Sequence, residues 1–153
     1  MLSVALLVAL ISDQVSKAIV EQQMVYLERI DLIGSLLGLR YVHNTGIGFG
    51  LLRGLDPFLI AGIQLMIIGV VLLAVFRFRY QISAAEEFFV GMIIGGAFGN
   101  LVDRLRLGHV VDFIELPFWP IFNAADSFLV VGAVLLLIAY YRRERRERRA
   151  HSI

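Results

Sequence analysis

The stretch PFLIAGIQLMIIGVVLLAVF, residues 57–76, decides the fold class of this chain. Gln64 is its one strongly polar residue, and a stretch of about 20 apolar residues is what a helix needs to cross the hydrocarbon core of a bilayer. Pro57 suits the first turn of such a helix, because its missing N–H costs no hydrogen bond there. We therefore expect a transmembrane helix here, the plainest lipid-facing helix of the chain.

The composition of the whole chain also indicates a membrane protein. Of its 153 residues, 59% are hydrophobic and 18% are charged, with a mean hydropathy of +0.80, far from an ordinary water-soluble domain. Three other apolar windows approach the length of a span. We predict an all-α membrane protein, a single integral membrane domain over 1–153, with transmembrane helices at about 1–20, 57–76, 88–105 and 122–141.

The positive charges predict how these helices are oriented. Arg77 and Arg79 follow the second window, and six Arg follow the fourth in YYRRERRERR. Because Lys and Arg are enriched at cytoplasmic helix ends, we expect both termini in the cytoplasm and the segments 21–56 and 106–121 on the outer side. The basic cytoplasmic tail, 142–153, is interpreted as a topology anchor on anionic lipid. Since the basic residues gather at one end of the chain, we expect no nucleic-acid partner.

Alternating helix directions bring polar residues to one level, in the outer half of the membrane. The polar clusters are Asp13 and Lys17 in the first window, Asn100, Asp103 and Arg104 in the third, and Asn123 and Asp126 at the start of the fourth. Asp112, in the adjoining outer segment, completes the set. Each ionisable group inside a membrane costs about 2.5 to 3.5 kcal/mol on insertion scales. Several at one level therefore predict a functional site.

Asp112 and Asp126 differ from the other charged residues, because neither has a basic residue at helical pairing distance. Two carboxyl groups in a low-dielectric site cannot both ionise cheaply, so they tend to share a proton. An aspartyl hydrolase requires this arrangement: one carboxylate takes a proton from water while its protonated partner polarises the scissile carbonyl. We therefore predict a catalytic pair.

The other charged residues have a simpler interpretation as structural support. Asp13 and Lys17 stand at i,i+4 spacing and can neutralise each other, and Asn100 and Asp103 share a helix face at i,i+3 spacing. Arg104 and Asp103 could pair with neighbours. Support or orientation of the catalytic pair is the leading interpretation for this group, with direct chemistry as the alternative.

Other chemistries find little support in the sequence. The chain has no Cys, which removes thiolate catalysis, and its three His lack the spacing of a zinc site. We expect no metal and no cofactor. Gly91, Gly95 and Gly99 recur at four-residue spacing, which predicts close packing of a neighbouring helix and not a phosphate loop.

The outer segment 21–56 differs from the spans. LRYVHN, residues 39–44, is rich in strand formers, and NTGIGFG, residues 44–50, is interrupted by glycines. We predict a small β-rich element between the first two helices, on the membrane surface, followed by a bend or hairpin-like loop. Two roles fit Asn44, a hydrogen bond to a peptide backbone or a cap on its own turn, and the spacing leaves both open.

Five motifs, in order along the chain, resemble the successive signatures of the bacterial lipoprotein signal peptidase family, signal peptidase II. They are DQVSK at 13–17, YVHNTGIGFG at 41–50, GGAFGNLVDR at 95–104, VVDFI at 110–114 and FNAADS at 122–127. The resemblance covers almost the whole chain. It implies an aspartyl endopeptidase of the bacterial cytoplasmic (inner) membrane, with its active site near the outer face. Such an enzyme removes signal peptides from prolipoproteins just before a diacylglyceryl-modified cysteine.

The resemblance also implies roles for individual residues. The catalytic pair of the family falls on Asp112 and Asp126. The positions near the substrate are matched by Asn44, Gly46, Asn100, Arg104 and Asn123, and the supporting positions by Asp13, Lys17 and Asp103. The implied partners are lipid-modified prolipoprotein signal peptides and membrane lipids, and we expect a monomer. Gly48 stands where the family usually has Ala, which should loosen the loop around it.

A small transporter or proton-conducting protein is the main alternative, because intramembrane acids also build proton relays. Two features count against it: the acids gather at one side of the membrane, and the spans show no inverted repeat. A structural assembly protein that uses the glycine face would leave the clustered acids unexplained.

Overall fold

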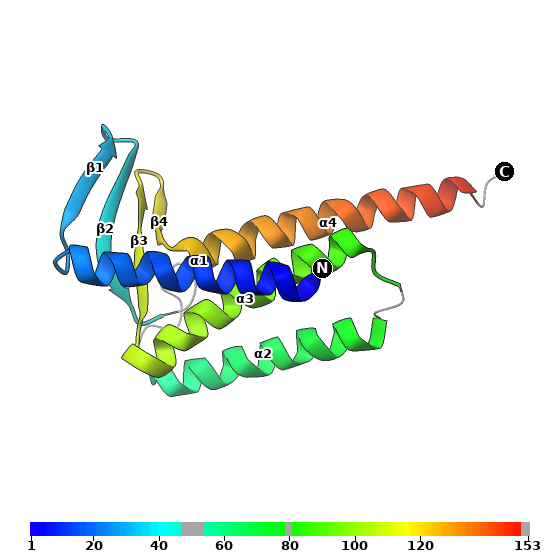
Figure 1. Cartoon of the computed structure of the whole chain (residues 1–153), viewed down its shortest axis with the longest axis horizontal. Coiled ribbons are helices and arrows are strands. Elements are labelled where there is room, and N and C mark those ends of the chain that lie inside the picture. Colours follow the sequence, from blue (N-terminus) through cyan, green and yellow to red (C-terminus); the bar gives the residue numbers. More distant parts are fainter. Residues whose placement is uncertain (47–53, 79–80, 151–153) are drawn as a thin grey trace.

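The computed structural model describes residues 1–46, 54–78 and 81–150, which form four long helices and a four-stranded sheet (Figure 1). The helices are α1 (Leu2–Gln23), α2 (Pro57–Phe78), α3 (Ala84–Leu107) and α4 (Ala124–Ala150), and the strands are β1 (Arg29–Ile33), β2 (Leu37–Asn44), β3 (Val110–Leu116) and β4 (Trp119–Phe122). All four of these helices are long and apolar enough to cross a membrane. The predicted fold class is confirmed.

The helices differ from the predicted windows mainly at their ends. α1 ends at Gln23 instead of near residue 20, and α3 begins at Ala84 instead of near 88. α4 continues to Ala150, so most of the basic tail is helical; Arg and Glu are good helix formers, although a hydropathy window excludes them. Arg79, which contributed to the predicted orientation, lies outside the described residues.

α3 is the central helix, and α1, α2 and α4 all pack against it. Its glycines allow the close approach of α1: a Cβ at Gly91 would meet the carbonyl oxygen of Leu2, and one at Gly95 would meet that of Leu6. At Gly99 it would meet the Asp13 carboxylate. The predicted helix packing at these glycines is confirmed, and it brings the polar residues of α1 directly against α3.

The sheet is antiparallel throughout, in the order β1-β2-β3-β4. β1 and β2 lie between α1 and α2, which confirms the predicted β-rich element. β3 and β4 come from the segment between α3 and α4 and were not predicted. β2 pairs with β3, so that Val42 faces Asp112 and Asn44 faces Val110. This pairing brings two distant segments of the chain together beside the helix ends.

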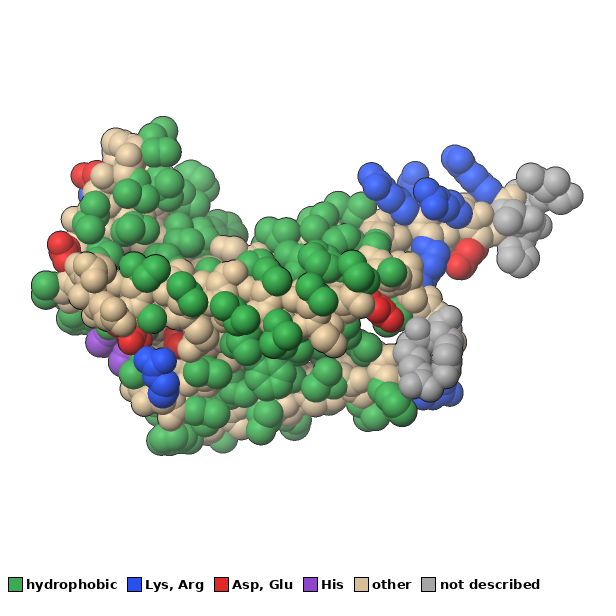
Figure 2. Space-filling model, viewed as in Figure 1, with side chains coloured by type: hydrophobic (Ala, Val, Ile, Leu, Met, Phe, Trp, Pro, Cys, Tyr) green, Lys and Arg blue, Asp and Glu red, His purple; other side chains and the backbone are tan. Residues whose placement is uncertain are grey.

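The two ends of the molecule differ in character. The sheet lies where α1 and α3 end and where α2 and α4 begin (Figure 1). At the opposite end the Arg side chains of α4 gather, while hydrophobic side chains cover much of the helical surface between the two ends (Figure 2). The buried Glu86 of α3 binds Arg143 of α4 there, at 2.8 Å, and fixes the two helices to each other.

Candidate active site

Asp126 is positioned by the start of α4. Asn123 precedes the helix: its Oδ1 accepts a hydrogen bond from the Asp126 amide at 2.9 Å, and its own amide donates to Asp126 Oδ2 at 3.3 Å. This reciprocal pair has the form of a capping box and satisfies N–H groups that a helix start leaves open. The sequence FNAADS thus builds a helix cap and holds Asp126 in the first turn at the same time.

Asp112 lies on β3, and its side chain is buried. Asn44 Nδ2 donates to its Oδ2 at 2.8 Å, and Asn123 Nδ2 donates to its Oδ1 at 2.7 Å. Burial and the neighbouring charge of Asp126 raise the pKa of Asp112 from its ordinary value of 3.8 to about 7, against the opposing effects of the two amides and of Lys17. Asp112 can therefore gain or lose a proton near neutral pH.

Asn100 connects this region to the buried charges behind it. Its Oδ1 accepts from Lys17 Nζ at 2.9 Å and from Asn123 Nδ2 at 3.0 Å, and its Nδ2 donates to Asp126 Oδ1 at 2.8 Å. Because an ammonium group only donates, the amide oxygen must face Lys17 and the NH₂ group must face Asp126. Lys17 thereby fixes which end of Asn100 reaches the acid.

Lys17 lies in a fully buried charge cluster. Its Nζ is 2.8 Å from Asp13 Oδ2 and 2.9 Å from Asp103 Oδ2. Asp13 also accepts from the backbone amide of Ala125 at 2.9 Å, and Asp103 accepts from that of Val111 at 3.1 Å. The two carboxylates thus join α1 and α3 to the start of α4 and to β3.

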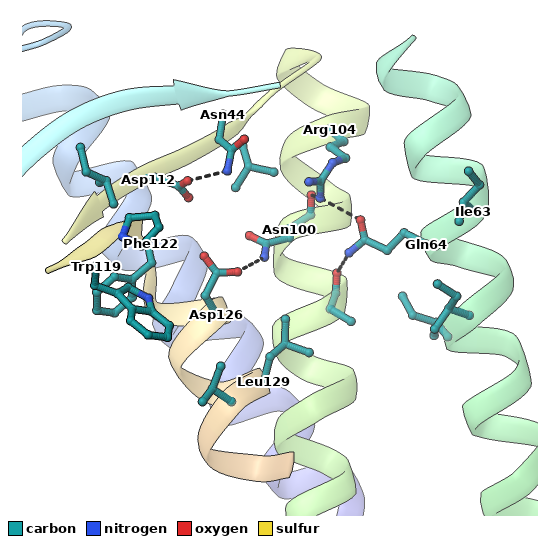
Figure 3. Close-up of a pocket in the computed structure, with 17 residues that line it drawn as sticks. Asn44, Ile63, Gln64, Asn100, Arg104, Asp112, Trp119, Phe122, Asp126 and Leu129 are labelled. Atoms are coloured by element: carbon teal, nitrogen blue, oxygen red, sulfur yellow. Dashed lines mark hydrogen bonds between the residues drawn. The ribbon is translucent and has the colours of Figure 1, made fainter. Parts of the chain in front are cut away.

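Arg104 connects α3 to α2 and to Gly46, which lies just after the end of β2. It donates to the Gly46 carbonyl at 2.7 Å. It also donates to Gln64 Oε1 at 2.8 Å, and Gln64 Nε2 donates to the Ala97 carbonyl at 2.6 Å (Figure 3). Gln64 was not predicted as a site residue. The available signal was its isolation, because a lone amide in an apolar span is costly in lipid and faces protein where it can.

A cavity of about 360 Å³ brings these groups together (Figure 3). Its polar lining consists of Asn44, Gln64, Asn100, Arg104, Asp112 and Asp126. The apolar lining comes mainly from α2, α4 and β4, for example Ile63, Leu129 and Trp119. Two carboxyl groups therefore line one cavity, together with four other polar side chains and an apolar wall.

The other predicted site residues lie around this cavity and not on its wall. Asn123 and Gly46 hold lining residues from behind, and Asp13, Lys17 and Asp103 form the buried cluster. Asn44 caps its own turn, since its Oδ1 accepts from the Gly46 amide at 2.9 Å, while its NH₂ group binds Asp112. The loop predicted after Gly46, with Gly48, lies outside the described residues.

Within the part of the chain that the structure describes, no three His, Asp or Glu side chains are grouped so that they could hold a metal ion. The charged atoms that line the cavity belong to Arg104 and to the two carboxyl groups. Membrane-spanning helices that carry such a site define an integral membrane protein equipped for acid–base chemistry at the end of a helix bundle.

Comparison with known proteins identifies the family. The signal peptidase (SPase) II family matches residues 5–142. A lipoprotein signal peptidase of Halothermothrix orenii is 37% identical over 95% of this chain and 98% of its own length, and one of Syntrophomonas wolfei is 41% identical over 94% of each chain. A solved structure of a bacterial membrane enzyme, determined by the in meso method at 2.3 Å resolution, superposes with a TM-score of 0.79, at 29% identity, over 91% of this chain and 86% of that one. The chain belongs to the signal peptidase II family, and it is a multi-pass membrane peptidase.

Proposed function

We propose that this chain is an aspartic endopeptidase, with Asp112 and Asp126 as its catalytic pair. As a signal peptidase II, it removes signal peptides from prolipoproteins, and we propose that it cuts just before the diacylglyceryl-modified cysteine. The observation that carries the proposal is the position of the pair: both carboxyl groups line one cavity, and the pKa of Asp112 lies at about 7. Asp112 therefore holds a proton below about pH 7, beside the second carboxyl group.

The reaction uses that single proton. The charged carboxylate takes a proton from a water molecule, whose oxygen attacks the scissile carbonyl carbon, while the protonated carboxyl donates to the carbonyl oxygen. The tetrahedral intermediate then collapses: the C–N bond breaks, and the leaving amine receives a proton from the pair. Water supplies the new C–O bond, so no covalent acyl-enzyme forms.

The surrounding residues orient the catalytic pair and the substrate. Asn100 donates to Asp126, and Asn123 donates to Asp112, so each amide fixes one carboxylate. Arg104, at the cavity wall, orients the peptide or the polar head of its lipid, and Gly46 and Gln64 hold its guanidinium. Asn44 orients Asp112, and the cluster of Asp13, Lys17 and Asp103 supports the whole arrangement.

The distribution of charge supports an orientation in the membrane. The Arg-rich end of α4 lies opposite the sheet, so we place both termini in the cytoplasm and the catalytic pair near the outer face (Figure 2). A cavity of about 360 Å³ is too small for two acyl chains in addition to a peptide. The chains then rest on the apolar outer faces of the helices, and a monomer takes its substrate sideways from the outer leaflet.

Purified protein should cleave a synthetic prolipoprotein that carries the diacylglyceryl group and should leave the unmodified peptide intact, because the lipid sets the depth of the scissile bond. Mass spectrometry of the products should place the cut directly before the modified cysteine. Equal cleavage of both substrates would contradict recognition of the lipid. Cleavage of neither by well-folded protein would favour the transporter alternative.

The pH dependence should report the proton that the pair shares. As the pH rises through about 7, Asp112 loses the proton that the reaction uses, and kcat/KM should fall. The hydrogen bond from Asn44 favours the charged form of Asp112, so Asn44→Ala should raise the pKa and move this fall to higher pH. Cleavage rates between pH 5 and 9 test this, with Thr45→Ala, an exposed neighbouring change, as the control. A fall that stays in place in Asn44→Ala would count against Asp112 as its source.

A further inference from the structure

A second cavity, of about 320 Å³, borders β4. It is lined by Arg29, Ser35, Glu115, Leu116, Pro117, Trp119, Pro120 and Ile121. Trp119, Pro120 and Ile121 also line the first cavity. β4 therefore borders both the proposed catalytic cavity and the second cavity.

The two cavities differ in chemistry, because charged groups of the sheet border the second one. Glu115 Oε2 lies 2.6 Å from Arg29 Nε, and Glu115 Oε1 accepts from Arg40 at 3.4 Å. Among the described residues, the buried atoms Glu115 Oε2 and Arg40 Nε have no hydrogen-bond partner; the short ion pair with Arg29 does not have the direction of a hydrogen bond. Glu115 lines this cavity and Arg40 does not, so a ligand in the cavity that donates a hydrogen bond to Glu115 Oε2 would be stabilised there.

The substrate must be polar on one side of the scissile bond and apolar on the other. The signal peptide is the apolar side and suits the walls that α2 and α4 give to the first cavity. The polypeptide beyond the modified cysteine is the water-soluble side, and it has to leave the first cavity at the sheet end of the molecule. The second cavity lies there, beside β4, and Arg29 and Glu115 give it a charged lining.

We propose that this second cavity binds the polypeptide segment immediately C-terminal to the modified cysteine, through its backbone; this inference rests on the proposed function. Each residue of an extended segment offers one N–H and one C=O, which match the carboxylate of Glu115 and the guanidinium of Arg29. Pro120 has no N–H, so β4 cannot offer a full set of backbone donors to an added strand. Side chains of the cavity therefore bind the segment instead. Binding of this kind tolerates many sequences.

The test compares two lipidated substrates with the same signal peptide. One ends one residue after the modified cysteine, and the other continues for five neutral residues. Wild-type protein should show a KM about tenfold lower for the longer substrate, the effect of one or two extra hydrogen bonds, with a similar kcat. Glu115→Ala should remove this advantage and leave the short substrate unaffected, whereas Glu115→Gln, which keeps an acceptor oxygen, should restore part of it.

Cleavage of the short substrate also shows that each variant is folded, and Arg106→Gln, on α3 away from this cavity, is the control. If the wild-type KM does not depend on length, or if Glu115→Ala raises the KM of both substrates equally, the inference is wrong and Glu115 has a structural role. Cleavage of neither length by wild-type protein would overturn the proposed function and this inference with it.

Discussion

Asp126→Asn is expected to lower the cleavage rate of a lipidated prolipoprotein by about 10³-fold, within the range for the loss of a general acid–base group. An amide can neither take a proton from water nor donate one to the carbonyl oxygen as a carboxyl group does. Because the substrate still fits the cavity, its KM should change little, and the loss should fall on kcat. Single-turnover cleavage with enzyme in excess measures this directly.

The Asp126→Asn protein should fold. Asn can keep its oxygen toward Asn100, which donates at 2.8 Å, and only the weaker contact with the Asn123 amide, at 3.3 Å, is lost. Asp112→Asn should also be inactive, but it is the less suitable test, since both hydrogen bonds to Asp112 are short, at 2.8 and 2.7 Å, and an added NH₂ group would face one of the two donors.

Asp56→Asn is the matched control for this change. Asp56 caps α2 through its Oδ1, which accepts from the amides of Phe58 and Leu59, and Asn caps helices about as well as Asp. It makes the same chemical change at the sheet end of the molecule without touching the cavity. Full activity in a folded Asp126→Asn protein would exclude the proposed catalytic pair.

The helices were predictable because their signal is local. The apolar run 57–76 predicts a transmembrane helix by itself, without reference to any other part of the chain. Because successive helices cross the membrane in opposite directions, the polar clusters of three helices then fall at one level. The end of α4 was less predictable: the hydropathy signal stops near Tyr141, whereas helical hydrogen bonding continues through the Arg and Glu residues to Ala150. The apolar composition of α4 therefore indicates where this helix leaves the membrane, but not where the helix ends.

β3 and β4 and the role of Gln64 escaped prediction because their partners are remote in the sequence. Pro117 and Pro120 make the segment after Asp112 look like a loop, and β3 pairs with the distant β2 on one side and with β4 on the other. In the sequence, Gln64 is a single polar residue in a helix expected to face lipid. Only the structure shows that Arg104 donates a hydrogen bond to it. The polar residues could be chosen from the sequence, but which of them line the cavity depends on packing between distant segments.

Lys17→Met should be the most destabilising substitution on the α1–α3 interface. It leaves Asp13 and Asp103, both buried within 3 Å of the lost ammonium group, without a counter-charge. Removal of one partner from a buried ion pair costs about 3 to 5 kcal/mol, since an uncompensated charge remains. Activity should fall with stability, because Lys17 also fixes the amide of Asn100 that binds Asp126.

Arg106→Met is the comparison variant, because it removes an ion pair across the same interface that is exposed and not buried. Arg106 also pairs across this interface, with Glu21 at 3.1 Å, but its side chain is 52% exposed, and an exposed pair contributes at most about 1 kcal/mol. Thermal unfolding in detergent micelles should therefore separate the two variants widely. Adding Asp13→Asn and Asp103→Asn to Lys17→Met should recover about half of the lost free energy of unfolding, because neutral amides carry no unpaired charge and can still accept the backbone N–H groups of Ala125 and Val111. If Lys17→Met unfolded at the same temperature as Arg106→Met, the buried cluster would not be the support on which the carboxyl pair depends.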